Sequence, residues 1–232
     1  MIPIRDINPT NRFAIVTLIL IILNIFVFVY EVALGREAGE LFVNTYSLVP
    51  ANLFSRGQAA DGTIPVIATI FTSMFLHGGL LHIAGNMLYL WIFGNNVEDA
   101  IGRIRFVFFY LICGVIAAYL YASANKDSTV PMLGASGAIS GVLGAYLLLY
   151  PRARVVTLVF FGFYFRIMEI SAMGVLGFWF LFQFLNALVQ SSSRGGVAWQ
   201  AHVAGFAAGM FLIGFFKRKG TPLWGGRGSR HL

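Results

Sequence analysis

Apolar runs close to 20 residues long recur along almost the whole of this 232-residue chain. A helix rises about 1.5 Å per residue, so about 20 apolar residues are needed to cross a hydrocarbon core about 30 Å thick. Because an open sheet cannot satisfy its backbone polar groups in lipid, such runs are expected to be helices. Six runs come close to that length, at roughly residues 13–31, 79–95, 105–123, 134–150, 170–190 and 199–216. The sequence therefore predicts an all-α membrane protein built as a bundle of six transmembrane helices.

The composition agrees with a single membrane domain. Hydrophobic residues make up 58% of the chain and charged residues 11%, against about 25% charged in a globular domain. No linker divides the apolar runs, so we expect one domain over 13–216, between a short N-terminus, 1–12, and a basic tail, 217–232. The first run exceeds the apolar core of a cleaved signal and is interpreted as a retained span. Cys113 is the only cysteine, which excludes an intramolecular disulfide.

The distribution of lysine and arginine predicts the orientation. If the N-terminus is cytoplasmic, that side receives Arg5, Arg12, Arg103, Arg105, Arg152, Arg154, Arg166, Lys217, Arg218, Lys219, Arg227 and Arg230. The opposite side receives Arg36, Arg56, Lys126 and Arg194. Cytoplasmic loops carry the excess of basic residues, so both termini are expected in the cytoplasm. The net charge of +7 is scattered between apolar runs, which disfavours a nucleic-acid partner.

Two connections between the spans are irregular. Residues 64–76 are apolar enough to rest in the membrane interface or to dip into the membrane. Residues 151–169 are also apolar, but charges interrupt them. We interpret this second segment as an interfacial hairpin. An extra pair of crossings there remains an alternative that would need unusually short spans.

Three spans carry polar side chains at a similar depth, near the end predicted to face outward. Burying an unpaired polar group in hydrocarbon costs several kcal/mol, so such residues usually face the bundle interior. His82, Ser136 and His202 each lie two or three residues inside a span. Asn86 follows His82 by four residues and shares its helix face. The sequence thus predicts one polar pocket just below the outer surface.

Small residues accompany the serine and the second histidine. Gly137 and Gly141 form GxxxG, and Gly205 and Gly209 follow His202. Faces of small residues let two membrane helices approach closely. The structural alternative is that GxxxG is ordinary packing and that Ser136 bonds back to its own helix. Three further polar residues are interpreted as interhelical hydrogen-bond partners: Asn24, Gln183 and Asn186.

A serine becomes a nucleophile when a base removes its proton, and histidine is the usual base. We therefore predict a pair of Ser136 and His202 without a carboxylate. The backbone N–H of Ser136 and the side chains of His82 and Asn86 can supply donors for a developing oxyanion. A zinc site at His77, His82 and His202 is disfavoured, because the chain has no HExxH motif. No metal and no cofactor are expected, and a transporter is a weaker reading because no span carries a charge near its middle.

Three motifs together resemble the rhomboid intramembrane serine proteases. They are GASG at 134–137, AHVAG at 201–205 and HGGLLHIAGN at 77–86, and the resemblance covers roughly residues 13–216. It implies a bundle of six helices whose fourth helix is short and ends in a water-filled cavity open to the outer side. It also implies that Ser136 is the nucleophile, His202 the general base, and His82 and Asn86 the oxyanion residues.

The resemblance assigns supporting roles around this site to His77, Gly134, Gly137, Ser140 and Gly205. It implies cleavage of membrane protein substrates within or near their membrane-spanning segments, without a metal or cofactor. Ser140 stands where some family members have a tyrosine that packs on the histidine, and Gly85 where some have a bulky aromatic residue. The 32–63 loop lacks a Trp-Arg pair seen in some relatives.

Two further expectations concern function and location. The alternative to a protease is a proteolytically inactive rhomboid-like protein that binds transmembrane clients. No amphipathic presequence precedes the first span, so we expect a multi-pass protein of a bacterial or archaeal cell membrane. Its active site would open to the non-cytoplasmic side.

Overall fold

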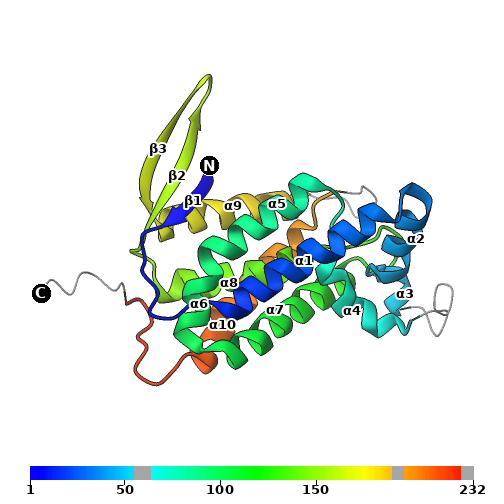
Figure 1. Ribbon diagram of the computed structural model, residues 1–232, viewed down its shortest axis with the longest axis horizontal. Coiled ribbons are helices and arrows are strands. Elements are labelled where there is room, and N and C mark those ends of the chain that lie inside the picture. Colours follow the sequence, from blue (N-terminus) through cyan, green and yellow to red (C-terminus); the bar gives the residue numbers. More distant parts are fainter. Residues whose placement is uncertain (55–63, 190–195, 226–232) are drawn as a thin grey trace, which may run out of the picture.

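A computed structural model describes residues 1–54, 64–189 and 196–225. Long helices run side by side, and a small sheet projects from one end of the bundle, next to the N-terminus (Figure 1). The helical elements are α1 (Ile15–Ala33), α2 (Arg36–Tyr46), α3 (Pro50–Phe54), η1 (Val66–Ala68), α4 (Thr69–Thr72), η2 (Ser73–Phe75), α5 (Leu80–Tyr89), η3 (Leu90–Gly94), α6 (Asn95–Ile101), α7 (Arg103–Ala124), α8 (Ser136–Leu149), α9 (Ala172–Val189) and α10 (Trp199–Phe216). The strands are β1 (Ile2–Asp6), β2 (Arg154–Phe161) and β3 (Tyr164–Ser171).

The six apolar runs all fold as helices. In the described ranges α1, α7, α9 and α10 are long and apolar enough to cross a membrane. A fifth candidate is the continuous helix α5–η3–α6, taken together with the bent segment before it. The sixth run is α8, a shorter apolar helix of 14 residues. The prediction of a mostly helical membrane bundle is therefore confirmed, and the chain is a multi-pass integral membrane protein.

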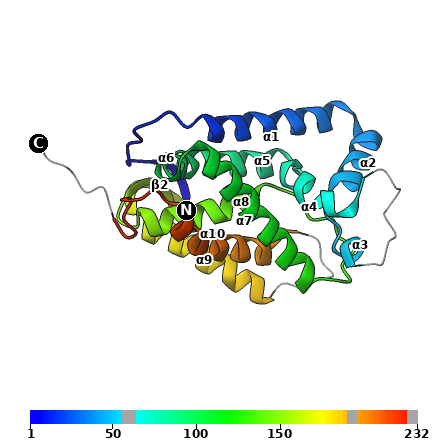
Figure 2. The same ribbon diagram turned by 90° about the horizontal axis from the view of Figure 1, so that it is seen from below.

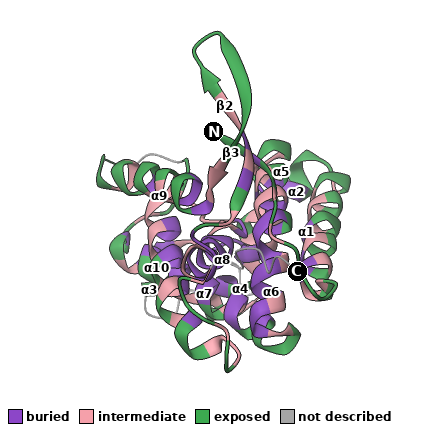
Figure 3. Ribbon diagram, turned by 90° about the vertical axis from the view of Figure 1, so that its left-hand side faces the viewer, coloured by how far each residue is buried: buried purple, intermediate pink, exposed green. Residues whose placement is uncertain are grey.

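Helix α8 lies in the middle of the bundle. Viewed end-on, it is surrounded by the other helices and is mostly buried (Figure 3). It contacts α10, α7, η3, α9 and α6. At about 1.5 Å per residue its length is only about 21 Å, less than the hydrocarbon thickness of about 30 Å. Protein rather than lipid covers its sides, so α8 can end below the membrane surface.

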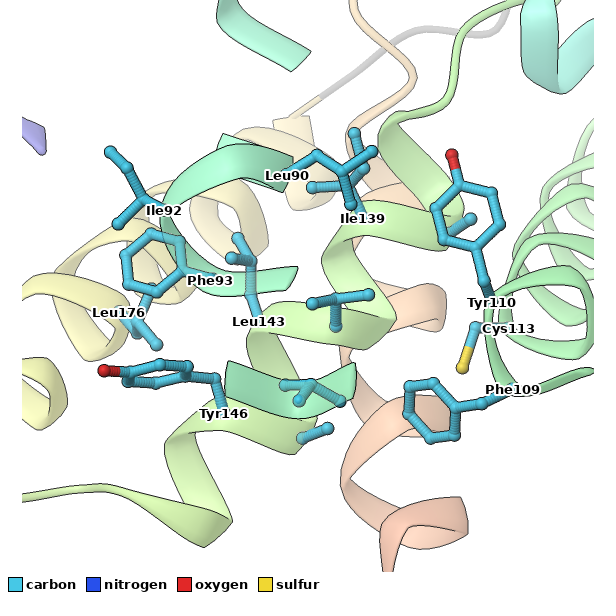
Figure 4. Packing of buried hydrophobic residues seen from close by; sticks show 14 of the residues in the cluster. Leu90, Ile92, Phe93, Phe109, Tyr110, Cys113, Ile139, Leu143, Tyr146 and Leu176 are labelled. Atoms are coloured by element: carbon cyan, nitrogen blue, oxygen red, sulfur yellow. The ribbon is translucent and has the colours of Figure 1, made fainter. Parts of the chain in front are cut away.

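Large side chains fill the space between α8 and the α5–η3–α6 helix. Leu143 and Tyr146 of α8 face Leu90 and Phe93 across this contact (Figure 4). The rings of Phe93 and Tyr146 meet edge to face, with centroids 5.0 Å apart. η3 is a π-helical turn within this helix. The core at this depth is therefore aromatic and well filled.

The small sheet is an addition to the all-α prediction. Strands β2 and β3 form an antiparallel hairpin, and β1 pairs antiparallel with β2. A hairpin was predicted for 151–169, and its β conformation suits a segment rich in β-branched and aromatic residues. Outside the bundle, strands can satisfy their backbone groups by pairing with each other. Val155 and Thr157 are buried at the base of β2, whereas Phe163, at the tip, is fully exposed.

Asp6 ties the sheet to the bundle. Its Oδ2 accepts hydrogen bonds from Asn96 Nδ2 at 2.7 Å and from the Tyr146 hydroxyl at 2.8 Å. Burial raises the pKa of this carboxyl to about 6. Residues 1–12, predicted as a short terminal segment, thus contribute a strand and a buried polar contact.

Glu98 of α6 supports the start of α1. The N-cap of α1, Ala14, offers no side-chain hydrogen bond. Glu98 instead accepts hydrogen bonds from the backbone N–H groups of Val16, at 3.1 Å, and Thr17, at 2.7 Å. The Thr17 hydroxyl donates a third, at 2.8 Å. A carboxylate at a helix N-terminus satisfies free donors and complements the helix dipole.

The connection between α1 and α5 contains the predicted irregular segment. Val66–Phe75 is helical and makes an angle of 80° with Leu80–Ile101. This bend is the geometry of a broken span or a re-entrant segment, one of the arrangements expected for 64–76. Residues 55–63 of the preceding loop lie outside the described residues, as do Arg194 and the end of the tail, 226–232.

Candidate active site

Ser136 and His202 meet where α8 and α10 begin. His202 Nε2 lies 2.7 Å from Ser136 Oγ, although the two residues are far apart in sequence. Ser136 is the first residue of α8, and His202 lies in the first turn of α10. The imidazole is buried, with 8% of the residue exposed. The two side chains that the sequence predicted to share a pocket are thus in hydrogen-bond contact.

Glycines bring these two helices together. A Cβ added at Gly205 would overlap the carbonyl oxygen of Gly137, and one added at Gly209 would overlap that of Gly141. The backbones of α8 and α10 are therefore in direct contact at both levels. The GxxxG pattern serves packing, as the structural alternative proposed, and this packing also sets the distance between serine and histidine.

The second ring nitrogen of His202 has a partner that the sequence did not identify. Nδ1 lies 2.7 Å from Gln183 Oε1, and Gln183 is buried on α9. A glutamine carbonyl only accepts hydrogen bonds, so Nδ1 carries the proton and Nε2 is free to accept one. Gln183 was expected to be an interhelical hydrogen-bond partner, which it is, but the histidine it contacts was not foreseen.

Two tryptophans flank the same imidazole. The Trp179 ring centroid lies 6.0 Å from that of His202 at an interplanar angle of 31°, and Trp199 lies 6.3 Å away at 84°. Trp179 and Gln183 are four residues apart and share one face of α9. That spacing was a usable signal for a polar site on this helix. Aromatic packing on His202 thus comes from α9 and α10 and not from position 140.

His82 and Asn86 border the same space from α5. Gly134 adopts φ +120°, and a Cβ built there would lie 2.8 Å from His82 Nε2 and 3.6 Å from Ser136 Oγ. His82 is therefore a near neighbour of the serine, with only a bare glycine between them. Asn86 Nδ2 is buried and has no hydrogen-bond partner in the described residues. An unpaired buried donor is costly unless a ligand oxygen completes it.

The remaining predicted residues lie next to these. His77 is fully buried, and its ring meets that of His82 edge to face at 5.1 Å. The Ser140 hydroxyl donates to the Ser136 carbonyl oxygen at 2.6 Å, so it supports the first turn of α8. No group of three histidine, cysteine or acidic side chains that could hold a metal occurs in the described ranges.

A cavity of about 680 Å³ lies at this end of the bundle, where α8 and α10 begin. Its walls come from α5, α8, α9 and α10 and from the loop before Ser136. The side chains that line it include those of His82, Asn86, Ser136, Trp179, Gln183 and His202. A hydroxyl in contact with an imidazole can lose its proton when it attacks a carbonyl carbon. His82 and Asn86 line this cavity together with Ser136.

Comparison with known proteins supports one family. The family model for the rhomboid domain matches residues 66–219. The chain is 36% identical over 96 residues to "Rhomboid protein 1, mitochondrial" of Saccharomyces cerevisiae, covering 40% of this chain and 28% of that protein. It is 42% identical over 81 residues to "Rhomboid protease GluP" of Bacillus subtilis, covering 34% of this chain and 15% of that protein.

A third relative is the mouse "Presenilin-associated rhomboid-like protein, mitochondrial", 38% identical over 84 residues, or 35% of this chain and 22% of that protein. The matches thus span less than a third of each of these relatives. The relatives are mitochondrial as well as bacterial, so they give the expected bacterial or archaeal membrane no support.

Proposed function

The chain belongs to the rhomboid family, and we propose that it is a serine endopeptidase that cuts membrane-anchored proteins within or near their membrane-spanning segments. The observation that carries this proposal is the 2.7 Å contact between Ser136 Oγ and His202 Nε2. The 2.7 Å contact of His202 Nδ1 with Gln183 supports it, because it leaves Nε2 as the acceptor.

In the proposed reaction Ser136 Oγ attacks the carbonyl carbon of the scissile amide. His202 Nε2 takes the hydroxyl proton during this attack and gives it to the leaving amine when the C–N bond breaks. The backbone N–H of Ser136 and the side chains of His82 and Asn86 stabilise the oxyanion. Water then attacks the acyl-enzyme, with His202 again acting as base, and Ser136 recovers its proton. No metal or cofactor takes part.

The substrate reaches the site from the membrane, and its helix must unwind locally before attack, since a helical amide is hydrogen-bonded and shielded. Small or helix-breaking residues at the cut site make this unwinding easier. The excess of basic residues at the opposite end of the bundle supports an orientation with both termini in the cytoplasm. The cavity then opens to the non-cytoplasmic side, where water can enter.

The test is cleavage of a membrane-anchored reporter by the purified protein in vesicles. Ser136→Ala and His202→Ala should each abolish cleavage. Ser123→Ala, which removes a hydroxyl from α7 outside the cavity, is the matched control and should cleave normally. A fluorophosphonate should label the parent and the Ser123→Ala variant but not Ser136→Ala. Equal cleavage by all four proteins would refute the Ser136/His202 pair.

The second candidate is an inactive rhomboid-like protein that binds transmembrane clients. The hydrogen-bond contact between Ser136 and His202 disfavours this candidate, because a protein that only binds clients has no need of an activated hydroxyl. It would be favoured if the parent captured the reporter without cutting it and if Ser136→Ala bound it equally well.

A further inference from the structure

A second cavity, of about 990 Å³, lies at the other end of the bundle from the candidate active site. Its walls are the start of α1, the turn between α6 and α7, and the chain just after α10. Six cationic side chains from these three segments line it: Arg12, Arg103, Arg105, Lys217, Arg218 and Lys219. Two carboxylates, Glu98 and Asp99, lie on the same wall. The cavity therefore carries a marked excess of positive charge.

The two carboxylates already accept hydrogen bonds from uncharged donors. Glu98 accepts three hydrogen bonds from the start of α1. Asp99 Oδ2 accepts from the backbone N–H of Asn11 at 2.8 Å and from its side-chain amide at 3.3 Å. Within the described ranges the one ion pair closer than 4.0 Å joins Arg36 and Glu40, outside this cavity. None of the six cations is therefore paired with a carboxylate of the residues that the structure describes.

Local contacts hold several of the cations in place. Arg103 Nη2 donates to the Phe13 carbonyl at 3.3 Å, and Arg105 Nη1 donates to the Phe216 carbonyl at 3.4 Å. Gly102 has φ +91°, and a Cβ there would lie 2.8 Å from Arg218 Nη2. The turn thus leaves room for a guanidinium that crosses it. Like charges gathered in one hollow repel each other, and a bound anion offsets that repulsion.

The border of the cavity is apolar. Phe13, Ile104 and Phe215 line it and are 65%, 75% and 72% exposed. Phe13 lies just before α1, Ile104 in the first turn of α7 and Phe215 in the last turn of α10. Free phosphate has no apolar part to pack against these side chains, whereas the acyl chains of a phospholipid can lie against them.

We propose that this cavity binds the phosphate headgroup of an anionic phospholipid, with the acyl chains against the exposed apolar border. Basic pockets between membrane helices near the headgroup level suit such lipids by charge. The proposal concerns the end of the bundle opposite the protease site and does not depend on the proposed peptidase activity.

The test uses the full chain in a mild detergent, titrated with phosphatidylglycerol, with retained lipid counted by native mass spectrometry. Phosphatidylcholine of the same chain length is the uncharged comparison, and inorganic phosphate is the headgroup-only comparison. Phosphatidylglycerol should be retained, phosphatidylcholine should not, and millimolar inorganic phosphate should leave retention unchanged. Displacement by inorganic phosphate would show a free-anion site and overturn the lipid proposal.

Variants locate the site. The double variant Arg105→Gln, Arg218→Gln should reduce phosphatidylglycerol retention at least about tenfold. Each basic residue near an anionic lipid surface contributes favourably to the binding free energy, and this variant removes two of them. The matched control, Arg152→Gln with Arg154→Gln, removes the same charge from exposed residues outside the cavity and should retain the lipid. An equal loss of lipid retention in both double variants would mean that the overall positive charge binds the lipid. That result would overturn the proposal that this cavity is the binding site.

Arg12→Gln is a second test that does not depend on whether the double variant folds. Arg12 is exposed, lies before the first helix and lines the cavity. Its substitution should reduce retention by a few fold while the melting temperature stays unchanged. Full retention by this variant and by a folded Arg105→Gln, Arg218→Gln protein would refute the proposal.

Discussion

Gln183 Oε1 lies 2.7 Å from His202 Nδ1, on the side of the ring away from Ser136. In the mechanism we propose, this buried amide takes the place of the carboxylate that orients the base in many serine hydrolases. It fixes the tautomer without placing a negative charge in the membrane interior, where an uncompensated charge is costly.

Gln183→Leu should slow the chemical step. The Nδ1 proton would lose its acceptor, and a buried unpaired donor costs about 1–3 kcal/mol, so kcat should fall about 5- to 150-fold with little change in KM. Gln183→Glu keeps an acceptor and should cleave faster than Gln183→Leu. Reporter cleavage in vesicles measures both. Equal rates for the two variants would show that Gln183 is only a packing residue.

Asn86→Ala should remove one donor from the proposed oxyanion site. Loss of one such donor typically costs about 2.7–4 kcal/mol, or about 10²–10³ in kcat. The matched control is Asn186→Ala, because Asn186 is half-buried on α9 and its side-chain amide donates to the Phe182 carbonyl of the same helix. The control should cleave like the parent. An Asn86→Ala protein with unchanged kcat would remove this residue from the mechanism.

Gly205→Ala should destabilise the bundle and disrupt the site together. The added methyl would overlap the Gly137 carbonyl oxygen, and overpacking of this kind typically costs about 1–3 kcal/mol. Gly214→Ala, in the same helix, has nothing within 4 Å of its new Cβ and should keep or raise stability. Thermal unfolding in detergent and reporter cleavage follow the two effects. A Gly205→Ala protein as stable as Gly214→Ala would contradict the close contact.

Glu98→Gln should loosen the start of α1. The neutral amide keeps the shape but loses charge-assisted hydrogen bonds, each worth about 1.5–3 kcal/mol. A lower melting temperature is expected, whereas Glu40→Gln, at an exposed ion pair, should have almost no effect. Unfolding monitored by tryptophan fluorescence compares the two. Similar melting temperatures would mean that Glu98 does not secure α1.

Asp6 makes stability depend on pH. Its pKa is raised from 3.8 to about 6, chiefly because burial disfavours the charged form. The folded state therefore prefers the protonated carboxyl, so this contribution is fully present below about pH 3.8 and is lost as the pH rises through about 6. The melting temperature of the parent should fall over this interval relative to that of Asp6→Asn. Parallel curves would show that Asp6 does not titrate in this way.

Much of this fold could be predicted, because few backbone conformations satisfy their hydrogen bonds inside lipid. Each long apolar run had to be a helix, and the boundaries expected for 199–216 match α10 (Trp199–Phe216). The pocket was also predictable. Polar residues near the ends of three spans are costly in lipid unless they face one another, and the structure brings His82, Ser136 and His202 to the same cavity.

Other features depend on contacts that one sequence does not reveal. Gln183 was a plain interhelical hydrogen-bond candidate, because its helical spacing indicates a face but not the opposite residue. The 151–169 hairpin is extended into a sheet of three strands by β1, which comes from the N-terminus and is distant in sequence. The basic cavity needs three distant segments to meet, and the sequence alone gave their charges only a role in topology.

The main chains of α8 and α10 meet directly, Gly137 against Gly205 and Gly141 against Gly209. This contact affects which substitutions the protein can tolerate. The spacing between Ser136 and His202 depends on peptide groups, which are chemically the same whatever amino acids surround them. Residues on the outer sides of the helices that surround α8 can therefore vary while the side chains of Ser136 and His202 keep their positions.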